Sequence, residues 1–326
     1  MRQHTIKTPY IIGEVHCYST EINGELVLFD CGPPTAEALD SLKSQIDLSR
    51  LKYLFITHCH VDHYGLVSKI TENSDARVFF PRNEAVRLKR HSECLDHLVH
   101  LLTELGCDDK ITVHIREKTE QERVTINAPE HYEIVEESDV PAKLGIKWMS
   151  CPGHSQSDLV YIYGKHAVTG DILLRNVFQV PILDVDTTTF AGRFHNYDAY
   201  CSSIISLQRL RGFLIHPGHR WQVDNVDATI LFYVKKTLER ARQVLRHTGD
   251  DTVIDLVRSL FGSIIKNPFF VHMKISETVF VLDFLADPGQ LKAALESMGL
   301  FNNVSDLYHS VVGKKGFGQK IINYQA

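Results

Sequence analysis

Short apolar runs separated by turn residues fill the first two-thirds of the chain, a pattern typical of β-strands. Residues 10–18 and 25–30 flank Asn23 and Gly24, and an Asn-Gly pair between two apolar runs predicts a β-hairpin. A further apolar run at 213–215 precedes a Pro-Gly turn. The remaining strands are expected at residues 51–57, 77–80, 112–115, 132–135, 146–150, 159–163 and 167–169.

Segments with helical apolar spacing alternate with these strands and then replace them. Helices are expected over residues 36–45, 65–70, 83–105, 198–210, 227–246, 252–261 and 291–300. Thr35 is placed to cap the first of these helices, and Gly106 ends the third. Predicted strands alternate with helices up to about residue 225, and only helical spacing follows, so the order predicts an α/β sandwich over residues 1–225. A mostly helical C-terminal region is expected over 226–326.

Composition narrows the class of protein. The chain has 326 residues, 44% of them hydrophobic and 23% charged, so a globular core is expected. A net charge of −5 disfavours nucleic acid as a partner, and no apolar run is long enough to span a membrane. Residues 1–10 are polar and lack the apolar segment of a signal peptide. Seven scattered cysteines without a C-x-x-C pair suit a reducing environment, which predicts a cytoplasmic protein.

The most informative segment is THCHVDHYG, which follows a predicted buried strand. It places His58, His60, Asp62 and His63 within six residues, in a chain that has 18 histidines. Imidazole and carboxylate groups at this density are typical ligands of a divalent transition metal. His58 and His60 point to the same side of an extended backbone, so they can bind one metal together. Asp62 and His63 follow where the chain turns, and they can face a second metal.

Three later segments place one more candidate ligand each after a predicted strand. His154 lies in CPGHS, Asp171 in VTGD and His219 in IHPGHR. Each of these motifs is weak alone, because a single histidine on a loop is usually a solvated surface residue. Together they supply one ligand after each of three successive strands, so one rim of the sandwich can gather them all.

These ordered motifs resemble the metallo-β-lactamase superfamily, in particular its glyoxalase II-like branch of metal-dependent hydrolases. The resemblance covers about residues 10–225 and implies a four-layer αββα sandwich with two metals at one edge. It implies that one metal is held by His58, His60 and His154, that the other is held by Asp62, His63 and His219, and that Asp171 bridges them. His216 also lies in the last motif, and the family pattern favours His219 over it.

The resemblance also implies a reaction. Two metals that share one water molecule lower its pKa and produce a hydroxide nucleophile, and Asp62 is expected to orient it and accept its proton. We therefore predict a binuclear hydrolase of a small ester, thioester or lactone. Zn is the favoured metal, with Fe and Mn as alternatives. A phosphodiesterase or nuclease on the same fold, an iron-dependent persulfide dioxygenase and an inactive binding module remain as other interpretations, the last disfavoured by the complete ligand set.

Substrate contacts are expected from the segment 173–197, which has few helix signals and follows the proposed bridging residue. Its candidate contacts are Arg175, Phe178, Arg193 and His195. The partner expected is a small molecule. The C-terminal region has nearly balanced charge and loosely resembles a winged-helix module; a lid or a homodimer surface is its predicted role.

Overall fold

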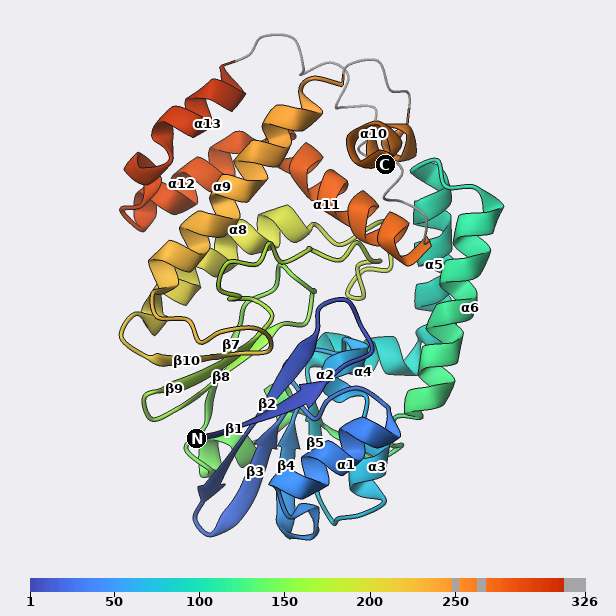
Figure 1. Cartoon of the computed structure of the whole chain (residues 1–326), viewed down its shortest axis with the longest axis vertical. Helices are drawn as coiled ribbons and strands as arrows, with labels where there is room; N and C mark the ends of the chain where they lie inside the picture. The colour runs from blue at the N-terminus through green and yellow to red at the C-terminus, as the bar shows by residue number, and fades with distance from the viewer. Residues whose placement is uncertain (248–251, 263–267, 314–326) are drawn as a thin grey trace.

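The structure is a computed structural model that describes residues 1–247, 252–262 and 268–313. Its strands form two sheets that pack face to face (Figure 1). The first sheet has the order β1-β2-β3-β4-β5-β6, antiparallel from β1 to β3 and parallel from β3 to β6. Its strands are β1 (Arg2–Lys7), β2 (Glu14–Ile22), β3 (Glu25–Phe29), β4 (Leu51–Phe55), β5 (Arg77–Phe80) and β6 (Glu133–Ile134).

The second sheet has the order β10-β9-β8-β7, with β10 parallel to β9 and the other pairs antiparallel. Its strands are β7 (Lys147–Ser150), β8 (Leu159–Tyr163), β9 (His166–Gly170) and β10 (Leu214–Pro217). The β2–β3 hairpin turns at Asn23 and Gly24, which both have positive φ, as the Asn-Gly pair predicted.

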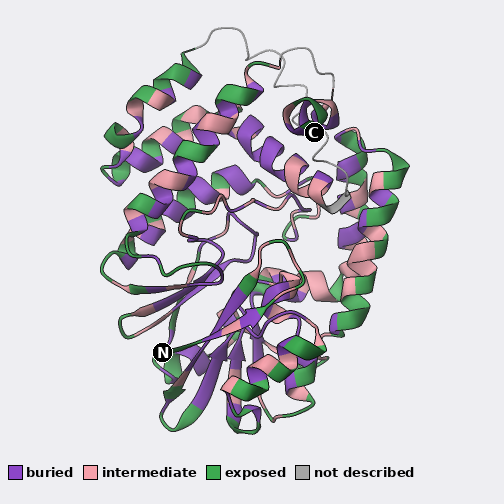
Figure 2. Ribbon diagram, in the orientation of Figure 1, coloured by how far each residue is buried: buried purple, intermediate pink, exposed green. Residues whose placement is uncertain are grey.

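Alternation along the strands of the first sheet builds two of the three hydrophobic clusters. In β3, Val27 and Phe29 face the second sheet, and Phe29 packs with Phe55 of the neighbouring strand β4 and with Tyr161 of the second sheet. Leu28, the residue between them, packs on the opposite side against the helix-bearing face. A third cluster covers the outer face of the second sheet. The layers therefore stack in the order helix, sheet, sheet, helix, which confirms the predicted αββα sandwich (Figure 2).

The helices of the N-terminal part are α1 (Ala36–Gln45), α2 (Val61–Tyr64), α3 (Val67–Thr71), α4 (Arg82–Lys89), α5 (His91–Glu104), α6 (Asp109–Ile126) and α7 (Val140–Lys143). Those of the rest of the chain are α8 (Asn196–Leu207), α9 (Val226–Val244), α10 (Val253–Phe261), α11 (Pro268–Ala286), α12 (Pro288–Ser297) and α13 (Ser305–Val312). Thr35 caps α1 as predicted, accepting a hydrogen bond from the Ala38 backbone N–H. None of the described helices is long and apolar enough to cross a membrane.

Three of the predicted elements differ in the structure. The strand predicted at 112–115 is wrong, because these residues lie inside α6, whose N-cap Asp108 accepts a hydrogen bond from the Ile111 N–H. The single helix predicted over 83–105 is two helices, separated at Arg90, which has non-helical backbone angles. The helix predicted over 65–70 is present as α3, which begins two residues later, at Val67, and follows the separate short helix α2.

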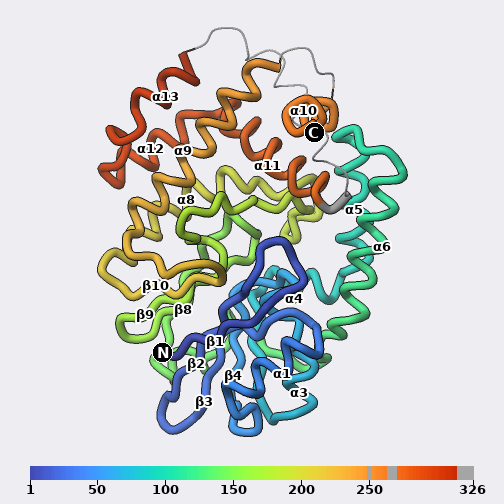
Figure 3. Tube along the Cα trace, in the orientation of Figure 1, coloured from blue at the N-terminus to red at the C-terminus, as the bar shows by residue number. Residues whose placement is uncertain are grey.

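Helices from both ends of the sequence share one hydrophobic cluster. Leu102 of α5, Ile204 of α8, Val234 of α9 and Phe280 of α11 belong to it, together with Val160 of the second sheet. The course of the chain in Figure 3 shows the C-terminal helices gathered above the second sheet, at the end opposite the β2–β3 turn. The position near residue 225, where the sequence texture changes, therefore lies inside a continuous core.

Candidate metal centre

Seven polar side chains meet where the strands end, at the edge between the two sheets. The segment between β4 and α3 contributes four of them, and the chain beyond β7, β9 and β10 contributes one each. Three groups of ligand atoms lie close enough together to hold a metal ion. They are His58, His60 and His154; His58, His63 and Asp171; and Asp62, His63 and His219. The structure thus brings together all seven residues that the motifs singled out.

The first cluster is made of three imidazoles whose nitrogens point at one another. His60 Nδ1 lies 3.0 Å from His58 Nε2 and 2.9 Å from His154 Nε2. The rings stand nearly perpendicular, with interplanar angles of 80° to 87°. Ring nitrogens converge on one point in this way when their lone pairs share a metal ion.

Hydrogen bonds on the far side of the rings fix which nitrogen faces the centre. His154 Nδ1 lies 2.7 Å from the Val180 carbonyl oxygen, and His219 Nδ1 lies 2.7 Å from that of Glu14. A carbonyl can only accept, so each Nδ1 holds a proton and donates it. The Nε2 lone pairs of His154 and His219 therefore face the cluster, as metal coordination requires.

The second cluster, made of Asp62, His63, Asp171 and His219, contains polar atoms that have no hydrogen-bond partner in the part of the chain that the structure describes. Asp62 Oδ2 and Asp171 Oδ2 lie 3.3 and 3.4 Å from His219 Nε2, and Asp171 Oδ1 lies 3.4 Å from His63 Nε2. Within the described residues, the buried atoms His63 Nε2, His219 Nε2 and Asp171 Oδ1 have no hydrogen-bond partner. Buried polar atoms are rarely left so. A cation bound among them satisfies all three, so the residues fit a divalent metal.

The electrostatics of the cluster separate its imidazoles into two kinds. Burial, with the neighbouring His63 and His60, lowers the pKa of His58 well below its usual value. Burial and the adjacent His154 lower the pKa of His60 to about 3. These rings are neutral near pH 7, the form that binds a metal. Burial also disfavours a charge on His63, but the carboxylates of Asp171 and Asp30 outweigh it and raise the pKa of His63 well above its usual value.

The last motif contains two histidines, and only one of them faces the centre. His219 joins the second cluster, whereas His216 Nε2 lies 2.8 Å from His166 Nδ1, outside all three candidate groups. Gly218 between them is required by space. A Cβ at this position would lie 2.5 Å from both Asp171 Oδ1 and His63 Cε1, so any side chain here would displace two of the candidate ligands.

Asp30 lies behind the cluster and holds both halves of it. It adopts a left-handed conformation with φ of 57°. Its carboxylate accepts hydrogen bonds from the backbone N–H and hydroxyl of Thr57, each at 2.8 Å, and lies 2.9 Å from His63 Nδ1. Thr57 Oγ1 in turn lies 3.1 Å from His58 Nδ1. These contacts favour a role for Asp30 as a support for the ligand histidine His63 over a role as a turn cap.

Replacing Asp30 by asparagine is expected to weaken metal binding about 10- to 100-fold, the usual effect of losing a carboxylate that orients a ligand histidine. Asparagine tolerates the positive φ, so the backbone is retained. Competition titration with a chromogenic chelator measures the affinity. The control is Asp47→Asn, which alters an exposed carboxylate that caps a 3₁₀ turn. Equal affinities for the two variants would show that Asp30 does not support the site.

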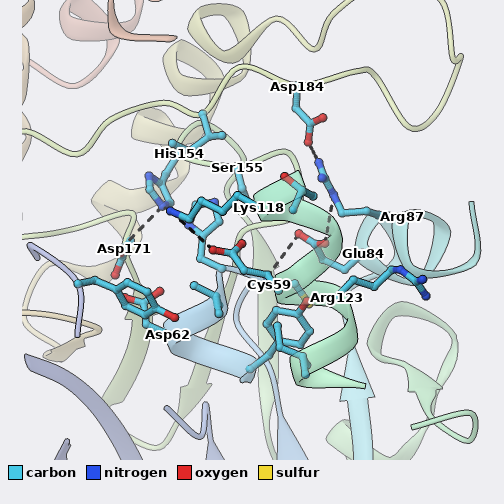
Figure 4. A pocket seen from close by; sticks show the side chains of 18 of the residues that line it. Cys59, Asp62, Glu84, Arg87, Lys118, Arg123, His154, Ser155, Asp171 and Asp184 are labelled. Atoms are coloured by element: carbon cyan, nitrogen blue, oxygen red, sulfur yellow. Dashed lines mark hydrogen bonds and ion pairs between the residues drawn. The ribbon is translucent and has the colours of Figure 1, made fainter. Parts of the chain in front are cut away.

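A cavity of about 1170 Å³ adjoins the cluster, and His60, Asp62, His154, Asp171 and His219 form part of its wall (Figure 4). Helices α4, α5 and α6, the segment 174–184 and the first turns of α11 also line it, as do residues 9–12 and 127–130. Sequence reasoning missed the contributions of α4 to α6. Because a strand was predicted at 112–115, the helical face of α6 was not expected. The i, i+4 spacing of Lys118 and Glu122 was the signal that could have indicated a helix there.

The four predicted substrate contacts have different surroundings. Phe178 lines the cavity and stacks on Tyr233, with ring centroids 4.6 Å apart. The other three do not line it. Arg175 forms an ion pair with Asp224, and Arg193 is buried against Asp283, with Nη1 2.9 Å from Oδ2. His195 is exposed and precedes α8. Among the four, the structure therefore leaves substrate contact as a proposal only for Phe178.

Comparisons with known proteins agree with this geometry. A family model described as the metallo-beta-lactamase superfamily matches residues 12–219. A relative from Bacillus subtilis, described as a probable metallo-hydrolase, is 25% identical over 310 residues, covering 86% of this chain and 90% of its own. A beta-lactamase-like protein 2 homolog from Caenorhabditis elegans is 23% identical over 264 residues, covering 78% of this chain and 73% of its own.

Two crystal structures have the same fold. A metallo-beta-lactamase family protein from Thermus thermophilus superposes with a TM-score of 0.71 at 21% identity, covering 88% of this chain and 93% of its own. A beta-lactamase domain protein from Burkholderia ambifaria gives 0.67 at 17% identity, covering 87% and 86%. Both alignments extend well beyond residue 219, so the C-terminal helices are part of the shared fold.

Proposed function

The chain belongs to the metallo-β-lactamase superfamily, and on this premise we propose that it is a binuclear metal-dependent hydrolase of an ester, thioester or lactone. The main support is the set of orphaned buried atoms His63 Nε2, His219 Nε2 and Asp171 Oδ1, which face one another beside a three-histidine cluster. A small-molecule substrate suits a concave site with a few convergent polar groups.

The proposal assigns each side chain a role. One metal would be held by His58, His60 and His154. The other would be held by Asp62, His63 and His219, and Asp171 lies between the two sets. Bound divalent metals would lower the pKa of a water molecule and polarise the scissile carbonyl. Asp62 also lines the cavity, so its carboxylate lies where it can orient a water molecule and accept its proton.

No serine or cysteine nucleophile is needed by this proposal. Cys31 and Cys151 are buried, and burial raises the pKa of the Cys31 thiol well above its usual value. The Cys151 thiol has its pKa raised to about 12 by burial. Neither thiol is a thiolate near pH 7, so neither suits nucleophilic attack.

The stoichiometry of metal binding tests the binuclear proposal. Protein stripped with a chelator and reloaded is expected to bind about two equivalents of metal, measured by elemental analysis, because the ligands divide into two sets. His219→Ala should retain about one equivalent, since the second set loses a ligand. His216→Ala is the matched control, three residues away in the same motif, and should retain two. One equivalent at saturation in the unaltered protein would contradict two sites.

A substrate panel separates the reaction classes. The panel contains a 4-nitrophenyl ester, an S-acyl thioester and a lactone, with bis-4-nitrophenyl phosphate as the phosphodiester. Turnover of a carbonyl substrate that disappears on chelation and returns with Zn supports the proposal. Exclusive turnover of the phosphodiester would replace it with a phosphodiesterase, and loading with Fe or Mn in parallel identifies the metal.

A further inference from the structure

The cavity beside the metal centre is long rather than round. Four consecutive turns of α6 line it, through residues 114–115, 118–119, 122–123 and 126. These positions span about 18 Å at the 1.5 Å rise of an α-helix. Asp62 and Glu122 both line this cavity, so the row of residues on α6 and the metal centre share one space. A scissile bond at the metals would occupy only one part of this space.

Most of the remaining wall is apolar. It is contributed by helices α4, α5, α6 and α11 and by the segment that follows the bridging Asp171. The apolar side chains that matter here are Leu88, Leu98, Ile115, Val177, Leu183 and Met273. The cavity volume of about 1170 Å³ exceeds the ~300–1000 Å³ usual for small-molecule sites, so the cavity suits a substrate larger than an acetyl ester.

Three of the four lysines and arginines in the wall have anionic neighbours, and the fourth, Lys89, lies over the Tyr132 ring. Arg123 Nε lies 3.0 Å from Glu120 Oε2. Arg87 forms ion pairs with both Glu84 and Asp184. The Lys118 ammonium lies 3.8 Å from Glu122 Oε1, one helical turn away. Figure 4 shows the Arg87 side chain between the carboxylates of Asp184 and Glu84. A polyanion such as a nucleic acid backbone is bound by cations that are not already neutralised in this way, so the wall favours an uncharged substrate group.

We propose that the substrate of this hydrolase carries an unbranched, uncharged apolar chain, which lies in the cavity against the apolar side chains of α4, α5 and α11 while the scissile carbonyl lies at the metal centre. This inference rests on the proposed hydrolase function and adds a substrate class to it. Burial of apolar surface is the source of selectivity, and each buried methylene is worth up to about a fourfold gain in affinity.

The test uses the metal-loaded full chain and 4-nitrophenyl esters of acetate, butyrate, octanoate and dodecanoate, below their micelle concentrations. Values of kcat/KM should rise at least a hundredfold from acetate to octanoate. Met273→Trp and Leu88→Trp place bulk into the cavity from α11 and α4, two different sides. Each should lower the ratio of kcat/KM for octanoate to that for acetate about tenfold. Met273→Leu is the matched control and should behave as the unaltered protein does.

The possible outcomes distinguish failure of this inference from failure of the proposed hydrolase function on which it rests. Metal-dependent turnover of acetate with no dependence on chain length overturns the inference and leaves the hydrolase proposal standing. Failure to hydrolyse any ester counts against the hydrolase, and binding then decides the inference. Calorimetry with dodecanamide should show binding that Met273→Trp weakens, and no binding overturns it. Inhibition of ester turnover by a single-stranded oligonucleotide at low salt would also overturn it.

Discussion

The His58→Ala variant is expected to lose its first metal ion and at least about a thousandfold of its hydrolytic rate. His58 Nε2 is one of three nitrogens that converge within 3.0 Å contacts, and two imidazoles alone do not complete a three-ligand site. Metal polarisation of the substrate is worth several kcal/mol, and each 1.36 kcal/mol is tenfold in rate. His154→Ala should behave alike, because it removes another member of the same cluster.

The fold should survive this change. The candidate ligands lie on loops beyond the strand ends, and the stacked aromatic residues Phe29, Phe55 and Phe79 between the sheets are untouched. Circular dichroism should therefore match that of the unaltered protein. His100→Ala alters an exposed histidine on α5 and serves as the control. Unaltered turnover in His58→Ala would refute the assignment of the first cluster.

The Asp171→Asn variant is expected to retain one metal tightly and to bind the second at least about a hundredfold more weakly. The Asp171 carboxylate lies between both clusters, 3.4 Å from His63 Nε2 and from His219 Nε2 and 3.8 Å from His154 Nε2. Asparagine retains the shape but removes the negative charge, so two nearby cations repel each other with less compensation. Losses of this size follow even when a carboxylate outside the ligand set is removed.

Metal content at a series of free metal concentrations measures this effect, and activity on the substrate identified by the panel should fall with the second metal. Asp224→Asn, which alters an exposed carboxylate paired with Arg175, is the control. A turn-forming aspartate tolerates asparagine with little change. Two tightly bound equivalents in Asp171→Asn would therefore mean that the residue only shapes the turn after β9.

The sequence allowed the metal cluster to be predicted because its information is local. The spacing of His58, His60 and His63 places their side chains relative to one strand end, and each later motif places one side chain after another strand. Strand pairing brings the strand ends together at one edge of the sandwich, independently of the conformation of the loops. The same argument predicted the hairpin at Asn23, since the backbone preference of that dipeptide is intrinsic.

The cavity could not be predicted in the same way, because its walls depend on packing between distant segments. Thr112, Val113 and Ile115 favour a strand by composition, yet the cap at Asp108 and the burial of Ile115 against α5 make them helical. Arg193 was expected at the substrate, but its partner Asp283 is 90 residues away. No local pattern marks such a pair.

The N-terminal hairpin also sets the order in which the site can be completed. The Glu14 carbonyl orients His219, and the His16 N–H bonds to the Gly218 carbonyl, so the last ligand docks on the first strands. About 150 residues separate His63 from His219. At roughly 5–20 residues per second, a ribosome needs about 10 to 30 s to add them. During synthesis the second cluster therefore exists only as a partial set until His219 has been added.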